Sequence, residues 1–237
     1  MRSVSLGVRL FRGRAAWLAA VVAVAFGSAA GRAQTFTWNQ PTTGGDWQTS
    51  ANWAPTTAPN AMSAVAVFGN VATGAHTVNL SAGVTLGELR FEDVNAHSTT
   101  AAYTIAAGQT ITFDNNDAPA LLTVGGFTRT NQTVAAALSV AGGDALTITN
   151  DGAPGLTTLT LGGALSATTA GTPLNVGGSS NTTISGAIGN NFGVLTKSGS
   201  GVLTLSGTNA YTGGTVINGG VVRVNTADGS SIVRSLG

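Results

Sequence analysis

The feature that most constrains this chain is a regular alternation of apolar and polar residues in short runs that glycines separate. From residue 193 to residue 224 the sequence reads GVLTKSGSGVLTLSGTNAYTGGTVINGGVVRV. Alternation with a period of two predicts half-buried β-strands, because successive side chains of a strand point to opposite faces. The glycines between the runs permit tight turns. The stretch therefore predicts short strands joined by turns, and it contains no catalytic motif.

The same pattern extends back to about Val78. In each instance two apolar residues flank one small or polar residue, which is most often threonine. The pairs are Val78/Leu80, Leu89/Phe91, Tyr103/Ile105, Ile111/Phe113, Leu122/Val124, Leu138/Val140, Leu146/Ile148, Leu159/Leu161, Leu174/Val176, Leu203/Leu205 and Val222/Val224. Because β-branched and aromatic residues favour strands, we predict an all-β fold with the apolar pairs inside and the threonines outside.

Three pairs of strands recur with identical spacing, in residues 103–113, 138–148 and 195–205. Each doublet forms either a hairpin of a β-sandwich or a corner between two strands of one coil. Comparable strands recur mostly every 15 to 21 residues, which is about the length of one coil of a parallel β-helix. We therefore predict a right-handed parallel β-helix, a solenoid of about eight coils. A β-sandwich is the alternative, because strand spacings of 8 to 12 residues also occur.

Residues 1–33 differ in composition from the rest of the chain. Four arginines, at positions 2, 9, 12 and 14, precede a 12-residue apolar run, and small residues follow it. This order predicts a secretory signal peptide cleaved after Ala33 or Ala30. The apolar run is shorter than the roughly 20 residues that a membrane-spanning helix needs.

The next segment, residues 34–70, contains Trp38, Trp47 and Trp53 and three of the six prolines. An open solenoid end must be covered, so we predict that this segment is an irregular, Trp-rich cap and that residues 71–237 form the solenoid. Exposed tryptophan faces that stack on sugar rings are the alternative role for these residues.

Charge and cysteine content narrow the range of partners. Without the signal peptide five basic and nine acidic residues remain, so the net charge is −4. A weakly acidic chain with no basic stripe is not expected to bind nucleic acid. There is no cysteine, so an exported chain of this kind must be stabilised by packing and backbone hydrogen bonds.

Residues 195–224 resemble the autotransporter-associated β-strand repeat. Its pattern has Lys-x-Gly-x-Gly-x-Leu-x-Leu-x-Gly, then Asn-x-Tyr-x-Gly-Gly-Thr, then a glycine and a closing strand. The matching residues are Lys197, Gly199, Gly201, Leu203, Leu205, Gly207, Asn209, Tyr211, Gly213, Gly214, Thr215, Gly219 and Val224. The Trp-rich segment is similar, more loosely, to the N-terminal opening of large exported proteins that carry such repeats.

The resemblance implies a β-helical passenger region of a surface protein, commonly exported through a C-terminal outer-membrane barrel. Residues 225–237 contain no alternating ten-residue strands of the kind that a barrel requires. We therefore expect a barrel that is separate or missing: the chain is either a fragment of an autotransporter, which the open last strand pair favours, or a module released whole. In both cases it is expected to be secreted or at the cell surface.

The sequence predicts no catalytic, cofactor or metal site. His76 and His97 are interpreted as surface residues, and neither belongs to a catalytic triad or a zinc motif. Glu88, Glu92 and Asp93 form one acidic group near Arg90. A second pair, Asp114 and Asp117, lies in a turn. These acids are predicted to solvate turns and discourage edge pairing. The alternative is a carbohydrate-active β-helix enzyme that uses some of them.

Two short loops offer hard oxygen ligands for calcium, residues 114–117 and 150–152. Neither has the spacing of a known calcium loop, and Asn and Asp are ordinary turn formers. We therefore predict an exported, non-enzymatic solenoid that acts as a structural stalk or adhesion module. Its partners would be surface glycans or host or cell-surface molecules, and a carbohydrate-binding or carbohydrate-active protein is the alternative.

Overall fold

The computed structural model describes residues 33–40, 44–69, 74–92, 101–225 and 231–235. The strands of this part of the chain form three sheets, labelled A, B and C in the order in which a coil such as β10–β11–β12 visits them. The predicted signal peptide lies outside the described residues apart from Ala33. Among the described residues, no helix has the length and apolar character needed to cross a membrane.

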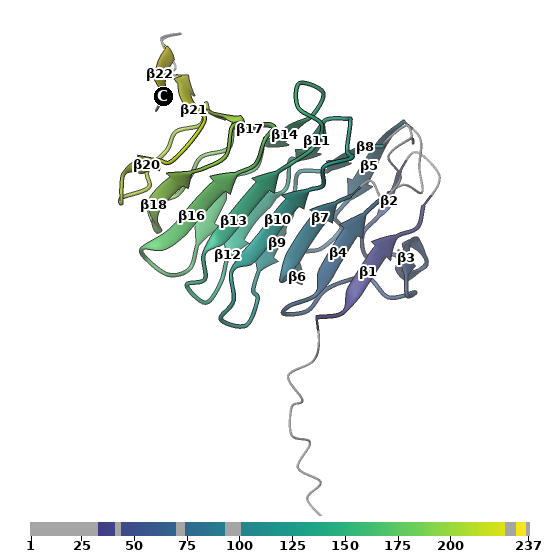
Figure 1. The fold of residues 1–237 in the computed structure, drawn as a ribbon. Helices are drawn as coiled ribbons and strands as arrows, with labels where there is room; N and C mark the ends of the chain where they lie inside the picture. The colour runs from purple at the N-terminus through teal and green to yellow at the C-terminus, as the bar shows by residue number, and fades with distance from the viewer. Residues whose placement is uncertain (1–32, 41–43, 70–73, 93–100, 226–230, 236–237) are drawn as a thin grey trace, which may run out of the picture. The chain divides into compact units, whose positions relative to one another are not determined.

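Sheet A contains nine strands, which lie side by side across the front of Figure 1. In spatial order they are β20 (Thr215–Ile217), β18 (Phe192–Lys197), β16 (Thr172–Gly177), β13 (Leu146–Asn150), β10 (Ala120–Val124), β7 (Glu88–Phe91), β4 (Val65–Phe68), β1 (Thr35–Trp38) and β3 (Trp53–Ala54).

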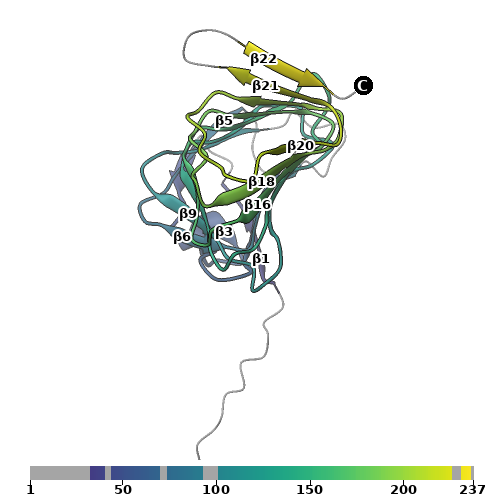
Figure 2. The ribbon, with the colours of Figure 1, turned by 90° about the vertical axis from the view of Figure 1, so that its left-hand side faces the viewer.

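Sheets B and C complete the coils, as the end view in Figure 2 shows. Sheet B has the order β2 (Gly44–Asp46), β5 (Ala75–Asn79), β8 (Ala102–Ile105), β11 (Gln132–Val134), β14 (Thr158–Leu161), β17 (Asn181–Ile184), β19 (Val202–Leu205), β21 (Val221–Asn225) and β22 (Ser231–Ser235). Sheet C contains β15 (Leu165–Ala167), β12 (Ala137–Val140), β9 (Thr110–Phe113) and β6 (Val84–Leu86). A short 3-10 helix, η1 (Ser50–Asn52), precedes β3.

The strand pairing defines a β-solenoid. Successive strands in the sequence fall in different sheets, and neighbours within a sheet come from successive coils and run parallel. The antiparallel pairs in the described part are β1 with β3 and β21 with β22. The three doublets are corners: β8–β9 joins sheets B and C, β12–β13 joins C and A, and β18–β19 joins A and B. The solenoid prediction is confirmed, and the sandwich alternative is wrong.

Coil length varies more than the sequence suggested. Thr215 pairs with Leu195, 20 residues earlier, within the predicted range. Leu121 pairs with Glu88, 33 residues earlier, because the connection between β7 and β8 is long. Strand pairing constrains only the strands, so loops of different lengths fit between the same sheets.

The alternation of side chains follows the prediction closely. Every predicted inward apolar residue is buried except Val224, which is partly buried in the last coil. The intervening residues Thr104, Thr112 and Thr160 are only half-buried and point outward. Each fully buried aliphatic side chain contributes about 1.5–3 kcal/mol of hydrophobic stabilisation, so the stacked interior is the main source of stability.

The Trp-rich segment is both a cap and a first coil. Trp38, Trp47 and Trp53 are all 0% exposed and pack around Phe68, with the ring centroids of Trp47 and Trp53 4.8 Å apart. The indole N–H of Trp53 donates to the carbonyl oxygen of Trp47 at 2.8 Å. The segment also supplies β1, β2 and β4 to the sheets, so the expected irregular backbone is wrong. Packed indoles with no exposed face also contradict the sugar-stacking alternative.

Candidate functional site

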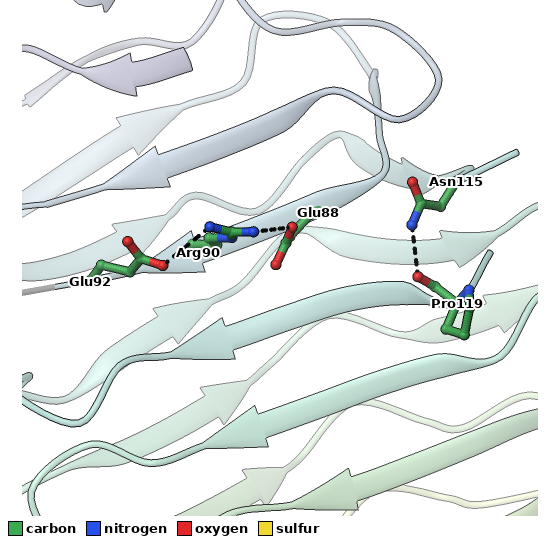
Figure 3. A network of polar contacts seen from close by, with 5 residues as sticks. All are labelled: Glu88, Arg90, Glu92, Asn115 and Pro119. Atoms are coloured by element: carbon green, nitrogen blue, oxygen red, sulfur yellow. Dashed lines mark hydrogen bonds and ion pairs between the residues drawn. The ribbon is translucent and has the colours of Figure 1, made fainter. Parts of the chain in front are cut away.

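Two acids of the first group lie at strand β7, on the outer face of sheet A: Glu88 begins the strand, and Glu92 directly follows it (Figure 3). Glu88, Arg90 and Glu92 alternate along one side of the chain, so their side chains are neighbours. The guanidinium Nη2 of Arg90 donates to Glu88 Oε2 at 2.7 Å, and Nη1 lies 3.6 Å from Glu92 Oε1. The hydrogen bond to Glu88 raises the pKa of Arg90. One guanidinium therefore pairs with two of the five carboxylates that the enzyme alternative could use.

The prediction for Glu88 was wrong in one respect. This residue lies within a strand and is only 8% exposed, whereas the sequence suggested that it solvates a turn. Its strand pairs with β4 on one side and β10 on the other, and Val65 and Leu121 are its register partners. Arg90 supplies the partner that a buried carboxylate requires. The neighbouring Asp93 lies outside the described residues, as does His97.

The second acidic pair lies in the turn between β9 and β10. Asn116 and Asp117 have φ values of 53° and 64°, which Asn and Asp tolerate better than most residues. The Asn115 side-chain amide donates to the carbonyl oxygen of Pro119 at 2.8 Å (Figure 3), so it closes the turn. Among the described residues, no three His, Cys, Asp or Glu side chains come together in a group that could hold a metal.

The other candidate calcium loop links two coils. Asn150 is fully buried at the end of β13, and its amide donates to the carbonyl oxygen of Asn181 in a later coil at 2.6 Å. Its side-chain oxygen accepts a hydrogen bond from the N–H of Gly152 at 3.2 Å. Asp151 accepts from the N–H of Ser179 at 3.0 Å. These oxygens are therefore engaged in holding the corners of neighbouring coils together.

His76 is the clearest error of the sequence interpretation. It was predicted on the surface, but it is 1% exposed, and its ring centroid lies 5.5 Å from that of Tyr103. Neither ring nitrogen has a hydrogen-bond partner among the described residues. The signal was present, because counting back by two from Val78 places His76 on the inner face of β5.

Similar buried polar residues recur where each coil passes from sheet A to sheet B. Tyr103 donates its hydroxyl to Gly69 O at 2.9 Å, Thr157 to Thr128 O at 2.7 Å, and Ser180 to Gly152 O at 2.6 Å. We call this set the corner seam; it comprises Tyr103, Thr128, Gln132, Asn150, Thr157, Ser180 and Lys197. Each of the three donors thus has a backbone carbonyl partner at the corner, as a buried polar side chain requires.

Lys197 is the last member of the corner seam and the chain's only lysine. It occupies the inward position at the end of β18 and is 2% exposed. Its ammonium donates to the carbonyl oxygens of Ser198, Gly199 and Gly219, at 3.0 Å for Gly199 and 3.4 Å for Gly219. Burial lowers its pKa. Gly219 belongs to the following coil, so the ammonium bridges two coils.

The glycines of this segment allow the same corners to stack closely. Gly199 has a φ of 70°, and a Cβ there would lie 2.4 Å from Gly178 O in the coil before. A Cβ on Gly220, at a φ of 68°, would lie 2.5 Å from Gly199 O. Both the backbone conformation and the spacing therefore require glycine.

Other residues of the segment fix its remaining loop. The side-chain oxygen of Asn209 accepts a hydrogen bond from the N–H of Ile188 in the coil before, at 3.3 Å. The hydroxyls of Tyr211 and Thr215 are 2.7 Å apart and share a hydrogen bond. These contacts hold residues 206–214 against the stack where the segment does not form a strand of sheet C.

These features define the class: a β-solenoid capped by tryptophans, whose last coils are built from a lysine-and-glycine repeat. Residues 195–224 match the family model of the passenger-associated-transport-repeat, a repeat typical of autotransporter passenger proteins. The bounds coincide with the stretch that resembled such a repeat, so that prediction is confirmed. The match covers these residues only. Searches of curated proteins and of solved structures each found no match to the chain.

Proposed function

We propose that this protein is an exported, non-enzymatic solenoid that serves as a stalk or adhesion module of an autotransporter-type surface protein. The observation that carries the proposal is the repeat at residues 195–224, which continues sheets A and B of the same stack as β18 to β21. A repeat of passenger type that extends a uniform stack suits a part whose task is to span distance or present a surface.

The outer face of sheet B supports this role. Six threonines from six successive strands lie in register along it: Thr77, Thr104, Thr133, Thr160, Thr183 and Thr204. Hydroxyl and methyl groups at a strand spacing of about 4.8 Å form a polar, uncharged surface that water solvates well. Such a face tolerates exposure and offers hydrogen bonds to glycans or to another protein.

Cell fractionation tests the surface assignment. An antibody against residues 100–237 would be used on fractions of the producing cells, and on intact cells treated with a protease that does not enter them. We expect the antigen in the outer membrane or medium and its loss on protease treatment. Antigen confined to the cytoplasm, or protected in intact cells and absent from the medium, would overturn the proposal.

A binding measurement then separates the two roles. Beads coated with the full chain would be applied to glycan arrays and to cell surfaces, with a double variant, Thr133→Arg and Thr160→Arg, as the matched control. Retention that the control loses assigns adhesion to the threonine face. Surface exposure without retention assigns the stalk role. Turnover of a glycan, abolished by Glu88→Gln, would instead support the enzyme alternative.

A further inference from the structure

The last coil of the repeat buries less apolar surface than the coil before it, with Val222, at 4% exposed, as its buried core residue among the described residues. Within the described part of the chain, strand β20 lies at the edge of sheet A, pairs only with β18, and leaves Val216 46% exposed. Ile217 and Val224 are only partly buried. In the preceding coil, by contrast, Leu195, Leu203 and Leu205 are almost completely buried. Hydrophobic burial therefore contributes much less to docking this coil than to docking the others.

One buried cation lies where the corner of the last coil meets the corner of the coil before it, a junction that we call the joint. The ammonium of Lys197 contacts the corner of its own coil through Ser198 and Gly199 and the corner of the last coil through Gly219. Hydrogen bonds from a charged donor are about twice as strong as neutral ones. Removing the ammonium would also leave buried carbonyl groups unpaired, which costs more than the bond itself contributes.

The fit around the ammonium is tight. A Cβ on Gly220 would lie 2.9 Å from Lys197 Nζ and 2.5 Å from the carbonyl oxygens of both Gly199 and Gly201. The corner of the last coil thus closes directly over the lysine. It cannot lift away without exposing the amine to solvent.

We propose that Lys197 is an internal tether for the last coil: its ammonium holds residues 215–225 on the stack, and this coil opens as a unit when the contact breaks. The proposal concerns a joint within the fold and holds whether the solenoid is a stalk or an adhesin. It makes Lys197 the residue that positions the coil that follows it.

Because Lys197 is the only lysine in the chain, acylation of its amine reports directly on the joint. The full-length chain would be treated with an N-hydroxysuccinimide acetate, and modification at Lys197 measured by peptide mass spectrometry against a peptide of residues 193–201. For a closed joint we expect acylation at least about 100-fold slower in the protein, since reaction then requires opening. Equal rates would overturn the proposal.

Two glycine variants provide a matched comparison. Gly220→Ala forces a methyl group against the ammonium, whereas Gly214→Ala has a similar φ, 76°, and would meet nothing within 4 Å. Both substitutions place a Cβ in a left-handed backbone conformation, which is unfavourable, but only Gly220→Ala disturbs the joint. We expect Gly220→Ala to accelerate acylation of Lys197 at least about tenfold over Gly214→Ala. Indistinguishable rates would contradict the tether.

Hydrogen exchange measured on the Lys197→Met variant tests the tether without acylation. Methionine keeps most of the apolar stem and removes the donors; Arg223→Met removes a positive charge from the exposed face of β21 as the control. We expect exchange in residues 215–225 to accelerate at least about tenfold in Lys197→Met, with β10, β13 and β16 unchanged. Unchanged exchange at 215–225 would overturn the proposal. If Lys197→Met does not fold, the acylation rates of the two glycine variants decide.

Discussion

Tyr103 illustrates how one residue serves both the interior and a corner of the stack. Its ring packs between His76 and Phe68, and its hydroxyl reaches the carbonyl oxygen of Gly69. Burial raises the pKa of Tyr103 to about 12, against an ordinary value of 10.0. The folded protein therefore keeps the phenol protonated in a pH range where the unfolded chain loses the proton.

The raised pKa of Tyr103 predicts that the folded protein becomes less stable at alkaline pH. Below pH 10 the phenol is neutral in both states and pH has no effect through this group. As the pH rises from about 10 to 12 the unfolded state releases the proton first, so the free energy of unfolding falls. Chemical denaturation at several pH values would measure the difference between the wild type and Tyr103→Phe.

Comparison with Tyr103→Phe isolates the group, because the opposing titration of Lys197 is common to both proteins. At neutral pH the free energy of unfolding of the variant should be about 1 kcal/mol lower than that of the wild type, because the hydrogen bond to Gly69 is lost. Above pH 10 this difference should shrink, because only the wild type is destabilised by ionisation of Tyr103. A gap that stays constant up to pH 12 would show that the Tyr103 pKa is not raised by folding.

At the scale of the strand and its corner, backbone approach between coils decides which residues fit. A Cβ on Gly163 would lie 2.0 Å from the carbonyl oxygen of Ala136 in the coil before. On the neighbouring Gly162 it would meet Ala135 Cα at 3.6 Å, an ordinary contact. Close approach of the neighbouring coil therefore requires glycine at position 163 but not at position 162, a difference that the sequence alone does not show.

The pair Gly163→Ala and Gly162→Ala tests this difference. Gly163→Ala should lower the free energy of unfolding by about 1–3 kcal/mol, because the backbone of two coils must separate to admit the methyl group. Gly162→Ala should change it by less than about 0.5 kcal/mol. Thermal melting of both variants would measure the effect, and equal destabilisation would show that conformational freedom rather than spacing selects these glycines.

At the scale of the whole described fold, each coil contacts only its neighbours. Stability in such a stack is approximately a sum of coil and interface terms, so damage at one end stays local. The tryptophan cluster stabilises the N-terminal coil, and the Lys197 joint lies in the C-terminal repeat, with the aliphatic interior between them. The two ends should therefore respond independently.

Trp53→Ala tests that independence. Loss of a fully buried indole should cost about 3–5 kcal/mol and accelerate hydrogen exchange in β1 and β4, while residues 195–224 keep their protection. Phe127→Ala, which removes an aromatic ring that is 54% exposed, is the control and should change little. Equal acceleration along the entire stack would mean that the coils unfold as one cooperative unit.

The local alternation of apolar and polar residues determined much of this fold. Alternation placed residues such as Leu146 and Ile148 inside and Thr147 outside, because side-chain direction in a strand depends only on position. The repeat at residues 195–224, the all-β class and the burial of the tryptophans in a cap also followed from the sequence.

Only the tertiary structure decided which polar residues point inward and what they bind. Lys197, Asn150 and His76 lie on the inner face, and for the first two the partners are carbonyl groups in a later coil. Coil lengths and the ion pairing of Glu88 were likewise set by loops and neighbouring strands. Strand pairing between coils joins residues 19 or more positions apart, and the alternation within a strand carries no information about which groups those positions will meet.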